Sequence, residues 1–263
     1  MKPAATIDGS ADPRLLLRPL LEGRIVELTL AAPPGNVLDL ALVKALRAAL
    51  QSAPVRAAHA IVLRSAGAHF SYGASIEDHL PERIAPFLRE FHGLAREQLS
   101  EGTPLVAAVQ GLCLGGGLEL ALLAQRIVAA PGAELGCPEI KLGVFAPLAS
   151  LLLPARIGQA GASDLLLTGR RVAASEALAL RLVDEVADDP AAAAQAWIEH
   201  HWLGHSRTSL RLATAAAQLA LAAEVTARLP AIEALYLERL MKTPDAVEGV
   251  RAFLEKRTAR FTG

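Results

Sequence analysis

Three consecutive glycines that lead into a helix form the most informative stretch of the sequence. A buried apolar strand predicted at residues 105–109 is followed by Gly115, Gly116 and Gly117, and Glu119 lies in the first turn of the next helix. Glycine permits positive φ angles and lets a ligand approach the backbone closely. The free N–H groups at a helix start favour negative charge, so this segment is a candidate oxyanion site. Alternatively, the glycines only make a tight turn and Glu119 complements the helix dipole at the surface.

A second carboxyl group stands in surroundings that could change its acidity. Glu139 directly follows Pro138 in the segment L-G-C-P-E-I-K-L-G, residues 135–143. A carboxyl group among apolar residues can have a raised pKa and act as an acid. The alternative is a solvated carboxylate in a turn. The segment carries chemistry only if the fold brings Glu139 close to Glu119.

A third segment, H-F-S-Y-G-A-S-I-E-D-H at residues 69–79, could supply a second backbone donor. It follows a predicted strand and leads to a predicted short helix that starts at Ser75. Gly73 and Ala74 would present N–H groups much as the glycine turn does, and two such donors could hold one carbonyl oxygen. The histidines of the segment, His69 and His79, are interpreted as partly exposed surface residues.

Other chemistries fit the motifs poorly. The glycine order G-x-x-x-G-G-G is not that of a dinucleotide site, and the lysine and hydroxyl residue of a phosphate-binding loop are absent. Cys113 and Cys137 form no C-x-x-C pair and are interpreted as buried thiols in a reducing compartment. His201 and His205 could lie on one helical face, but with His200 they are interpreted as a chance surface cluster, so no metal is expected.

Composition limits the function classes further. The 263 residues include 52% hydrophobic but only 4% aromatic residues, so alanine and leucine must fill the core. With 26 basic against 27 acidic residues, a broad hold on nucleic acid is not expected. The N-terminal sequence lacks a signal-peptide-like apolar stretch, and the longest uncharged run, residues 102–118, is short for a membrane span. We therefore expect a soluble cytoplasmic protein without a membrane partner.

Periodicity predicts the elements that must position these groups. Alternating or continuous apolar runs predict strands, and apolar residues three and four apart predict helices. The expected strands are 25–30, 60–63, 105–109 and 127–129, with a further short apolar run at 182–186. The expected helices are 38–50, 86–99, 118–124, 191–203, 210–229, 231–240 and 245–257, with a turn at 111–117. Pro190, Pro230 and Pro244 are expected at helix starts or breaks. This predicts an α/β core at 14–190 with the active site, followed by a helical region at 191–263.

In this order, the three segments resemble the enoyl-CoA hydratase/isomerase (crotonase) family. The matching motifs are F-S-x-G-A at 70–74, V-A-A-V-Q-G-x-C-L-G-G-G-L-E at 106–119, P-E-I-x-L-G at 138–143 and L-L-T-G-R at 166–170. The resemblance implies a spiral of ββα turns that forms two sheets, with C-terminal helices that pack on the core and on a neighbouring subunit. It further implies a trimer or a dimer of trimers.

The resemblance also implies roles for particular residues. The N–H groups of Ala74 and Gly116 would bind the thioester oxygen of an acyl-CoA, and Glu119 and Glu139 would hold a water molecule and move protons. The implied contacts to the acyl group and CoA are Ala68, Phe70, Tyr72, Gly73, Ser75, Leu114, Gly115, Pro138 and Phe145. CoA belongs to the substrate, so no separate cofactor is expected. Its nucleotide would lie near residues 66–72, where Lys256 or Arg257 could help.

Within the family, the chain resembles members that hydrate a cyclic conjugated dienoyl-CoA. The similarity lies in F-S-Y-G-A-S-I-E-D-H-L-P, P-E-I-K-L-G-V-F-A-P and E-A-L-Y-L-E-R-L-M. Ser75 stands where a straight-chain hydratase usually has Asp, Cys137 where Gln is common, and Phe145-Ala-Pro-Leu-Ala replaces a glycine-rich segment. The alternatives are a straight-chain hydratase, an isomerase or thioester hydrolase on the same scaffold, and an RNA-binding protein of the same fold.

Overall fold

The computed structural model describes residues 12–263, so the N-terminal stretch inspected for a signal peptide lies almost entirely outside the described residues. Its strands form two sheets, of six and three strands. The larger sheet contains β1 (Leu15–Leu20), β2 (Ile25–Leu30), β3 (Ala60–Ser65), β4 (Leu105–Val109), β6 (Arg126–Ala129) and β9 (Glu185–Val186) in that spatial order. The smaller sheet contains β5 (Leu112–Leu114), β7 (Glu134–Gly136) and β8 (Arg171–Ala173).

Most of the larger sheet is parallel, which requires crossover connections through helices. Strands β2, β3, β4, β6 and β9 run parallel, and only β1 pairs antiparallel with its neighbour β2. Strand β1 lies at the sheet edge, the position where a proline such as Pro19 is tolerated within a strand. In the smaller sheet, β5 and β7 are parallel and β8 closes the edge antiparallel.

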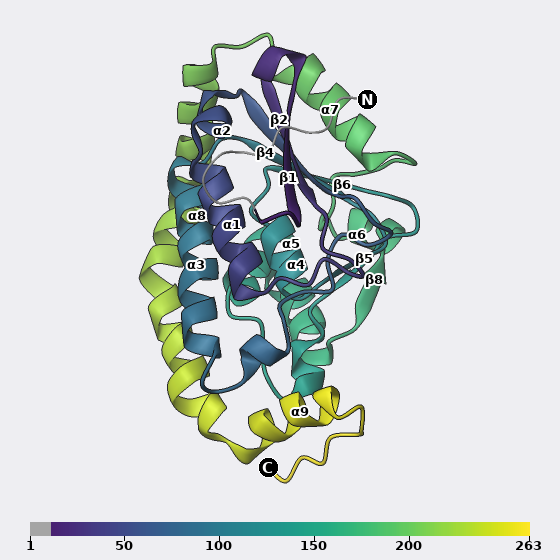
Figure 1. Ribbon diagram of the computed structural model, residues 1–263, viewed down its shortest axis with the longest axis vertical. Coiled ribbons are helices and arrows are strands. Elements are labelled where there is room, and N and C mark those ends of the chain that lie inside the picture. The colour runs from purple at the N-terminus through teal and green to yellow at the C-terminus, as the bar shows by residue number, and fades with distance from the viewer. Residues whose placement is uncertain (1–11) are drawn as a thin grey trace.

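Helices cover the sheets and extend the molecule at its C-terminal end (Figure 1). The α-helices are α1 (Leu40–Gln51), α2 (Ala53–Ala57), α3 (Ile84–Glu101), α4 (Gly116–Ala121), α5 (Ala149–Thr168), α6 (Ala174–Ala179), α7 (Pro190–His201), α8 (Arg207–Ala234) and α9 (Pro244–Leu254). Short 3-10 turns are η1 (Leu21–Gly23), η2 (Glu77–His79), η3 (Pro138–Leu142) and η5 (Leu240–Lys242), and η4 (Leu235–Arg239) is a π-helical turn.

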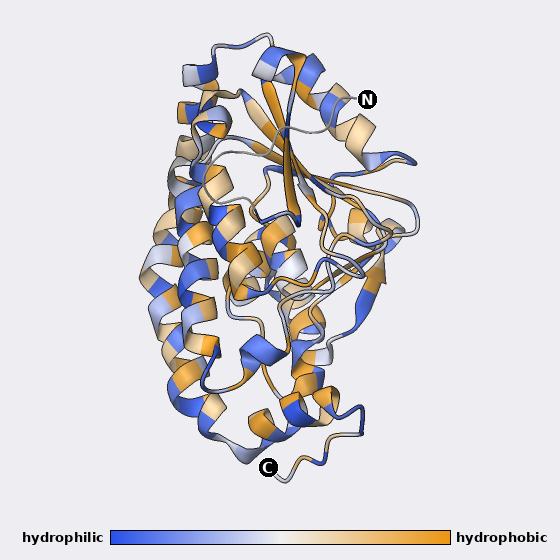
Figure 2. Ribbon diagram, in the orientation of Figure 1, coloured by the Kyte–Doolittle hydropathy of each residue, from blue (hydrophilic) through white to orange (hydrophobic). Residues whose placement is uncertain are grey.

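Both faces of the larger sheet are buried, as expected for parallel strands. One face packs into the main core with α1 and α3, and Ile61 and Leu63 of β3 point to it. The other face packs against α7, where Val62 of β3 meets Ile198 in a separate apolar cluster. Figure 2 shows the central strands as largely apolar and the outer helices as mixed. Leucine, alanine and valine supply most of this core, which confirms the expectation from the low aromatic content.

The predicted strands at 25–30, 60–63, 105–109 and 127–129 are confirmed, as are the helices near 38–50, 86–99 and 191–203. Two predictions between residues 70 and 120 are wrong, and one strand was not predicted. The segment 111–117 is not one turn, because β5 occupies Leu112–Leu114 before the glycines. The short helix after Ser75 is only the 3-10 turn η2. Strand β1 has no counterpart among the predictions, because it lies in a leucine cluster interrupted by arginine and proline.

Pro230 was predicted to start or break a helix, but it lies inside the continuous helix α8. Helix α8 continues through it to Ala234 and passes directly into η4, so no separate helix covers 231–240. Packing explains the difference, since α8 lies along α3 for much of its length (Figure 1) and Leu229 is fully buried beside the proline. Tertiary packing thus offsets the cost of a proline within the helix.

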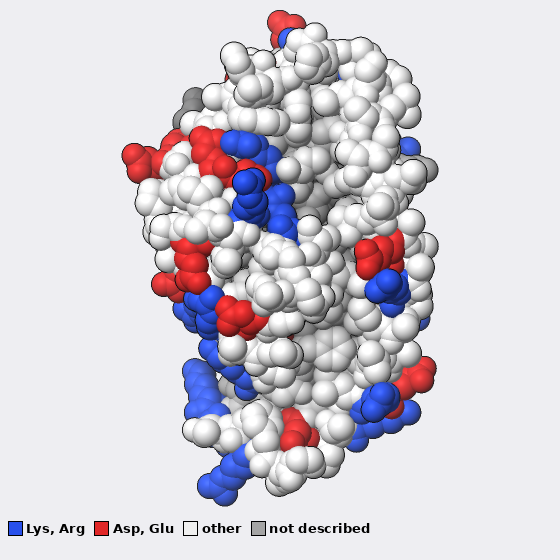
Figure 3. All heavy atoms as spheres, turned by 180° about the vertical axis from the view of Figure 1, so that it is seen from behind, with Lys and Arg blue, Asp and Glu red and all other residues white. Residues whose placement is uncertain are grey.

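The described part of the chain contains no helix long and apolar enough to cross a membrane. On the face seen in Figure 3, basic and acidic side chains lie beside one another around a broad uncharged area.

Candidate active site

The loop that carries Ala74 is fixed by backbone hydrogen bonds on two sides. On one side, the N–H of Leu38 donates to the carbonyl of Gly73 at 2.9 Å, and the N–H of Ser75 donates to the carbonyl of Leu38 at 2.8 Å. On the other side, the N–H of Ser71 donates to the carbonyl of Leu112 in β5 at 3.0 Å. The loop therefore runs like an extra strand between the segment before α1 and β5.

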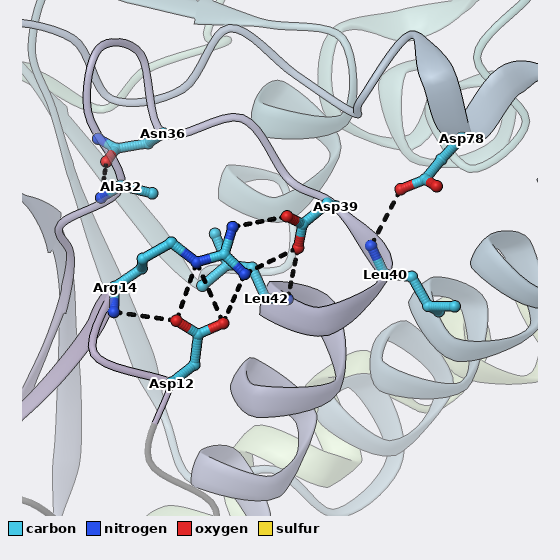
Figure 4. Close-up of polar contacts among 8 residues, drawn as sticks. All are labelled: Asp12, Arg14, Ala32, Asn36, Asp39, Leu40, Leu42 and Asp78. Atoms are coloured by element: carbon cyan, nitrogen blue, oxygen red, sulfur yellow. Dashed lines mark hydrogen bonds and ion pairs between the residues drawn. The ribbon is translucent and has the colours of Figure 1, made fainter.

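Asn36 bonds to this loop, and two aspartates hold the start of α1 next to Asn36 in the chain (Figure 4). The Asn36 side chain accepts from the N–H of Ala32 at 2.8 Å and donates to the carbonyl of Phe70 at 3.0 Å. Asp39 caps α1 and also binds Arg14, while Asp78 accepts from the N–H of Leu40 at 3.1 Å. The Asp78 side chain is thus hydrogen-bonded to the first residue of α1.

His79 corrects another expectation, because its side chain is buried rather than exposed. Its Nδ1 lies 2.8 Å from the carbonyl of Ser75, and its ring packs near Phe87. Burial lowers the pKa of His79, so the neutral ring holds the end of the loop. His69 is half-buried, and its Nδ1 accepts from the N–H of Leu112 at 3.0 Å.

The two N–H groups predicted to bind an oxyanion, those of Ala74 and Gly116, have no partner among residues 12–263. The loop uses the groups on either side of Ala74, and the Ala74 N–H itself donates to nothing in that range. Gly116 is the first residue of α4, so its N–H has no partner within the helix. A Cβ atom on Gly116 would lie 3.1 Å from the Ala74 nitrogen, which shows that the two amides are neighbours. The predicted pair of donors is thus brought together.

The glycine turn is required by geometry at Gly115. Its φ angle is +49°, and its N–H donates to the carbonyl of Gly136 at 2.9 Å. A Cβ atom at this position would lie 2.1 Å from Oε1 of Glu139, so any side chain would displace the carboxyl group. The backbone site and the carboxyl site therefore share a wall at Gly115.

Glu119 is buried inside the protein, not on the surface as the alternative interpretation had it. It is 4% exposed, and its Oε1 accepts from the N–H of Ala149, at the start of α5, at 2.7 Å. Burial raises the pKa of Glu119, and the bond from Ala149 partly opposes that rise. The start of α5 thereby holds the Glu119 carboxyl group in place.

Glu139 has fewer partners than Glu119. It is 9% exposed, and its Oε2 is buried without a hydrogen-bond partner among the described residues. Burial and the nearby charge of Glu119 raise the pKa of Glu139 to about 8. Both residues also meet at Gly115, because the N–H of Glu119 donates to the Gly115 carbonyl at 2.9 Å and a Cβ atom on Gly115 would touch Oε1 of Glu139. Such a pair can hold a water molecule and exchange protons with it near neutral pH.

Turn η3, which carries Glu139, is held in place by the C-terminal helix α9. A Cβ atom on Gly249 would lie 2.0 Å from the carbonyl oxygen of Leu142, and one on Gly143 would lie 2.9 Å from that of Asp245. Only glycine lets the two backbones approach this closely. The position of Glu139 therefore depends on a helix more than a hundred residues later in the chain.

The remaining predicted contact residues differ in how far they are buried. Phe70, Gly73, Leu114 and Gly115 are buried, whereas Ser75, Pro138 and Phe145 are half-buried. Ala68 and Tyr72 lie at the surface, where the Tyr72 ring covers Gly35 and stands 5.0 Å from the His69 ring. Arg257, suggested as a CoA contact, is engaged with Glu248 at 2.5 Å.

Two residues near the glutamates were not assigned a role from the sequence. Tyr236, on η4, is 1% exposed, and its ring stands 5.1 Å from that of Phe145 in an edge arrangement. Burial and the charges of Glu139 and Glu119 raise the pKa of Tyr236, which places the phenol in the field of both. His92, on α3, is fully buried and pairs with Glu233 at 2.6 Å. Tyr236 is distant in sequence from the motifs and His92 lies on a helix between two of them, so local spacing gave no signal for either.

The buried thiols were predicted correctly: Cys113 and Cys137 are free and buried, and burial raises the pKa of both. Their position in the core makes neither one a nucleophile. Among residues 12–263, no three histidine, cysteine or acidic side chains are arranged to hold a metal ion.

Sequence comparison now assigns the class of protein. The model of the Enoyl-CoA hydratase/isomerase family matches residues 21–263, so the chain belongs to this family. It is an enzyme whose family implies an acyl-CoA substrate. The chain is 46% identical over 241 residues to cyclohexa-1,5-dienecarbonyl-CoA hydratase of Thauera aromatica, covering 91% of this chain and 93% of the relative. It is 35% identical to a probable enoyl-CoA hydratase of Rhizobium meliloti, covering 91% and 95%. These relatives support a hydratase activity.

Solved structures agree on the fold. An enoyl-CoA hydratase/isomerase from Pseudoalteromonas atlantica superimposes with a TM-score of 0.79 at 28% identity, covering 95% of this chain and 100% of that one. The human mitochondrial delta3-delta2-enoyl-CoA isomerase gives a TM-score of 0.83 at 22% identity, covering 92% and 97%. The predicted crotonase fold is therefore confirmed.

Proposed function

We propose that this enzyme adds water to cyclohexa-1,5-diene-1-carbonyl-CoA and forms 6-hydroxycyclohex-1-ene-1-carbonyl-CoA. Hydration is supported mainly by one observation. Two unpaired backbone donors, at Ala74 and Gly116, lie next to two buried carboxyl groups, Glu119 and Glu139. The choice of the cyclic substrate is supported by the 46% identity to the Thauera hydratase.

The thioester oxygen would bind to the N–H groups of Ala74 and Gly116. When water attacks the β-carbon, electrons move towards this oxygen and an enolate charge develops on it. Two fixed amides stabilise that charge without reorganising, and each is worth on the order of 10²–10³ in rate. Because the loop bonds already hold both amides, their orientation costs little when substrate binds.

The two glutamates would handle the water and its protons as a pair. One carboxylate takes a proton from water as the oxygen bonds to the β-carbon of the ring. The resulting dienolate carries charge at the far end of the second double bond, and a proton from the carboxyl pair is added there. The remaining double bond shifts next to the thioester, so one water is gained and nothing is oxidised. A carboxyl group with a pKa of about 8 can hold a proton near neutral pH for this step.

The acyl ring would lie against the half-buried Ser75, Pro138 and Phe145, next to the buried Phe70. Phe145 follows the glutamate segment where the family commonly has glycines, and its ring adds a flat apolar wall. Ala68 and Tyr72, at the surface end of the same loop, would face the CoA part of the substrate. CoA is part of the substrate, and the proposal requires no further cofactor.

A straight-chain enoyl-CoA hydratase is the second candidate, because the Rhizobium relative, named a probable enoyl-CoA hydratase, is 35% identical over nearly the whole chain. This reaction would use the same amides and glutamates. The two candidates differ in the acyl group that would bind against Phe145, which is a ring in one case and a straight chain in the other.

We also propose that the enzyme works as a trimer or a dimer of trimers, in the cytoplasm, within anaerobic benzoyl-CoA degradation. Leu212 and Leu219 on α8 are 67% and 69% exposed, and association would cover such side chains. Sedimentation equilibrium gives the oligomer mass directly; a monomer would contradict this part of the proposal.

The activity is tested by incubating the purified protein with the cyclic dienoyl-CoA and, in parallel, with crotonyl-CoA. We expect a gain of one water by mass on the cyclic substrate, with crotonyl-CoA left largely unchanged. Hydration of crotonyl-CoA alone would favour the second candidate. Hydration of neither would overturn the proposed function.

A further inference from the structure

Two buried oxygen atoms on the carboxyl side of the site are left unpaired among the described residues. The Tyr236 hydroxyl and Oε2 of Glu139 are both buried and have no partner among residues 12–263. A buried polar atom without a hydrogen-bond partner destabilises a protein, because the water that it lost on folding is not replaced. The phenol can donate a hydrogen bond and an oxygen of the Glu139 carboxyl group can accept one, so a bound molecule that accepts from Tyr236 and donates to Glu139 would satisfy both.

The segment after Glu139 offers few other donors to such a molecule. Pro147 has no N–H, and the N–H of Ala149 is already bonded to Glu119. The N–H of Ser150 donates to the carbonyl of Ala146 at 3.1 Å. This part of the backbone is therefore largely committed, and the phenol remains as a free donor on the carboxyl side.

The placement of Tyr236 is fixed by its surroundings. One turn earlier, Glu233 binds the buried His92 of α3 at 2.6 Å, which sets the register of the helix. The phenol ring then packs edge-on against Phe145. Tyr236 lies on the π-helical turn η4, a departure from α-helical geometry that is frequent at functional sites and re-aims the side chains it carries.

We propose that Tyr236 is a water-positioning residue, whose hydroxyl donates to the same water molecule that Glu119 and Glu139 hold. Such a water donates one hydrogen bond to an oxygen of each carboxyl group, accepts one hydrogen bond from the phenol, and keeps one lone pair. That lone pair is left to point at the β-carbon of the substrate. The phenol thus selects which lone pair attacks, and it does not itself gain or lose a proton. This inference rests on the proposed hydration.

The test is the variant Tyr236→Phe, which removes only the hydroxyl oxygen and keeps the ring against Phe145. We expect kcat for hydration to fall about 10- to 100-fold, the effect of one lost hydrogen bond in the transition state. KM should stay within about twofold, because the phenol contacts water rather than the thioester. The melting temperature should be equal or higher, since an unpaired buried hydroxyl is lost.

Two further variants separate this role from a structural one. Glu238→Gln changes one exposed side chain on the same turn and should leave kcat unchanged. Tyr236→Leu removes the ring; if only the ring matters, Tyr236→Leu is impaired and Tyr236→Phe is not, which would overturn the proposal. A raised KM with unchanged kcat, or a clearly lower melting temperature in Tyr236→Phe, would overturn it as well. If the unmodified enzyme hydrates neither acyl-CoA, the proposed function has failed instead.

Discussion

The two halves of the candidate site are built in opposite ways. On the amide side, backbone bonds hold the segments around Ala74 and Gly116, while the N–H groups of these two residues have no partner among residues 12–263. On the carboxyl side, Glu139 and Tyr236 are side chains whose buried oxygens lack partners. The amide half suits a group that every acyl-CoA shares, the thioester oxygen. The carboxyl half suits the part of the reaction that differs between substrates, the placement of water and protons.

Removing the carboxyl chemistry should have the largest effect. Glu139→Gln keeps the size of the side chain but cannot exchange a proton, and we expect kcat to fall by about 10²–10⁴-fold. Glu119→Gln should behave alike, because the two groups act as a pair. Steady-state hydration rates measure the loss, and circular dichroism confirms an intact fold. Turnover near the unmodified rate in either variant would contradict the two-glutamate mechanism.

The wall shared by the two halves gives the next largest effect. In Gly115→Ala, the new Cβ would meet Oε1 of Glu139 and the residue would keep a φ angle of +49°. We expect kcat to fall at least tenfold and the free energy of unfolding to fall by about 1–2 kcal/mol. Gly132→Ala is the matched control, because a Cβ there meets nothing within 4 Å. If Gly115→Ala and Gly132→Ala had the same kcat and the same free energy of unfolding, the contact between Gly115 and Glu139 would not be rigid.

The unusual acidity of the carboxyl half should be visible in stability. Since the pKa of Glu139 is raised to about 8 in the folded protein, the folded state holds a proton that the unfolded chain releases near its ordinary pKa of 4.5. The stabilisation is complete below pH 4.5, declines as pH rises and is lost above about pH 8. Urea unfolding from pH 5 to 9 should show this decline. In Glu139→Gln the free energy of unfolding should fall less steeply with pH. An equally steep fall would show that the proton on Glu139 is not the cause.

The support of the amide half predicts the smallest effect. Asp39→Ala removes the cap of α1, seen in Figure 4, and should lower the free energy of unfolding by about 1 kcal/mol. Because the loop around Ala74 keeps its bonds to Leu38 and β5, kcat should change less than twofold. A large loss of kcat would show that the amide half depends on its outer support more than the bonds suggest. Chemical denaturation and initial rates measure the two quantities.

The amide half was largely predictable from the sequence, and the carboxyl half only in part. The glycine turn and the loop at 70–74 have local motifs, because backbone geometry depends on which residues lie next to one another. The closeness of Glu119 and Glu139 followed from the family resemblance, not from their spacing. Tyr236 and His92 could not be predicted, since their approach depends on how α8 packs along α3 and on a π-helical turn that no propensity indicates. The continuation of α8 through Pro230 was missed for the same reason.

The close contact of α9 with the turn that carries Glu139 has a consequence for biosynthesis. The strands of both sheets and both amide donors lie within residues 12–186, well before the last helix of the chain. Glu139, however, gains its backing only when Gly249 reaches Leu142. A nascent or truncated chain would therefore bind a thioester before it could activate water, and turnover would begin only after the last helix has docked.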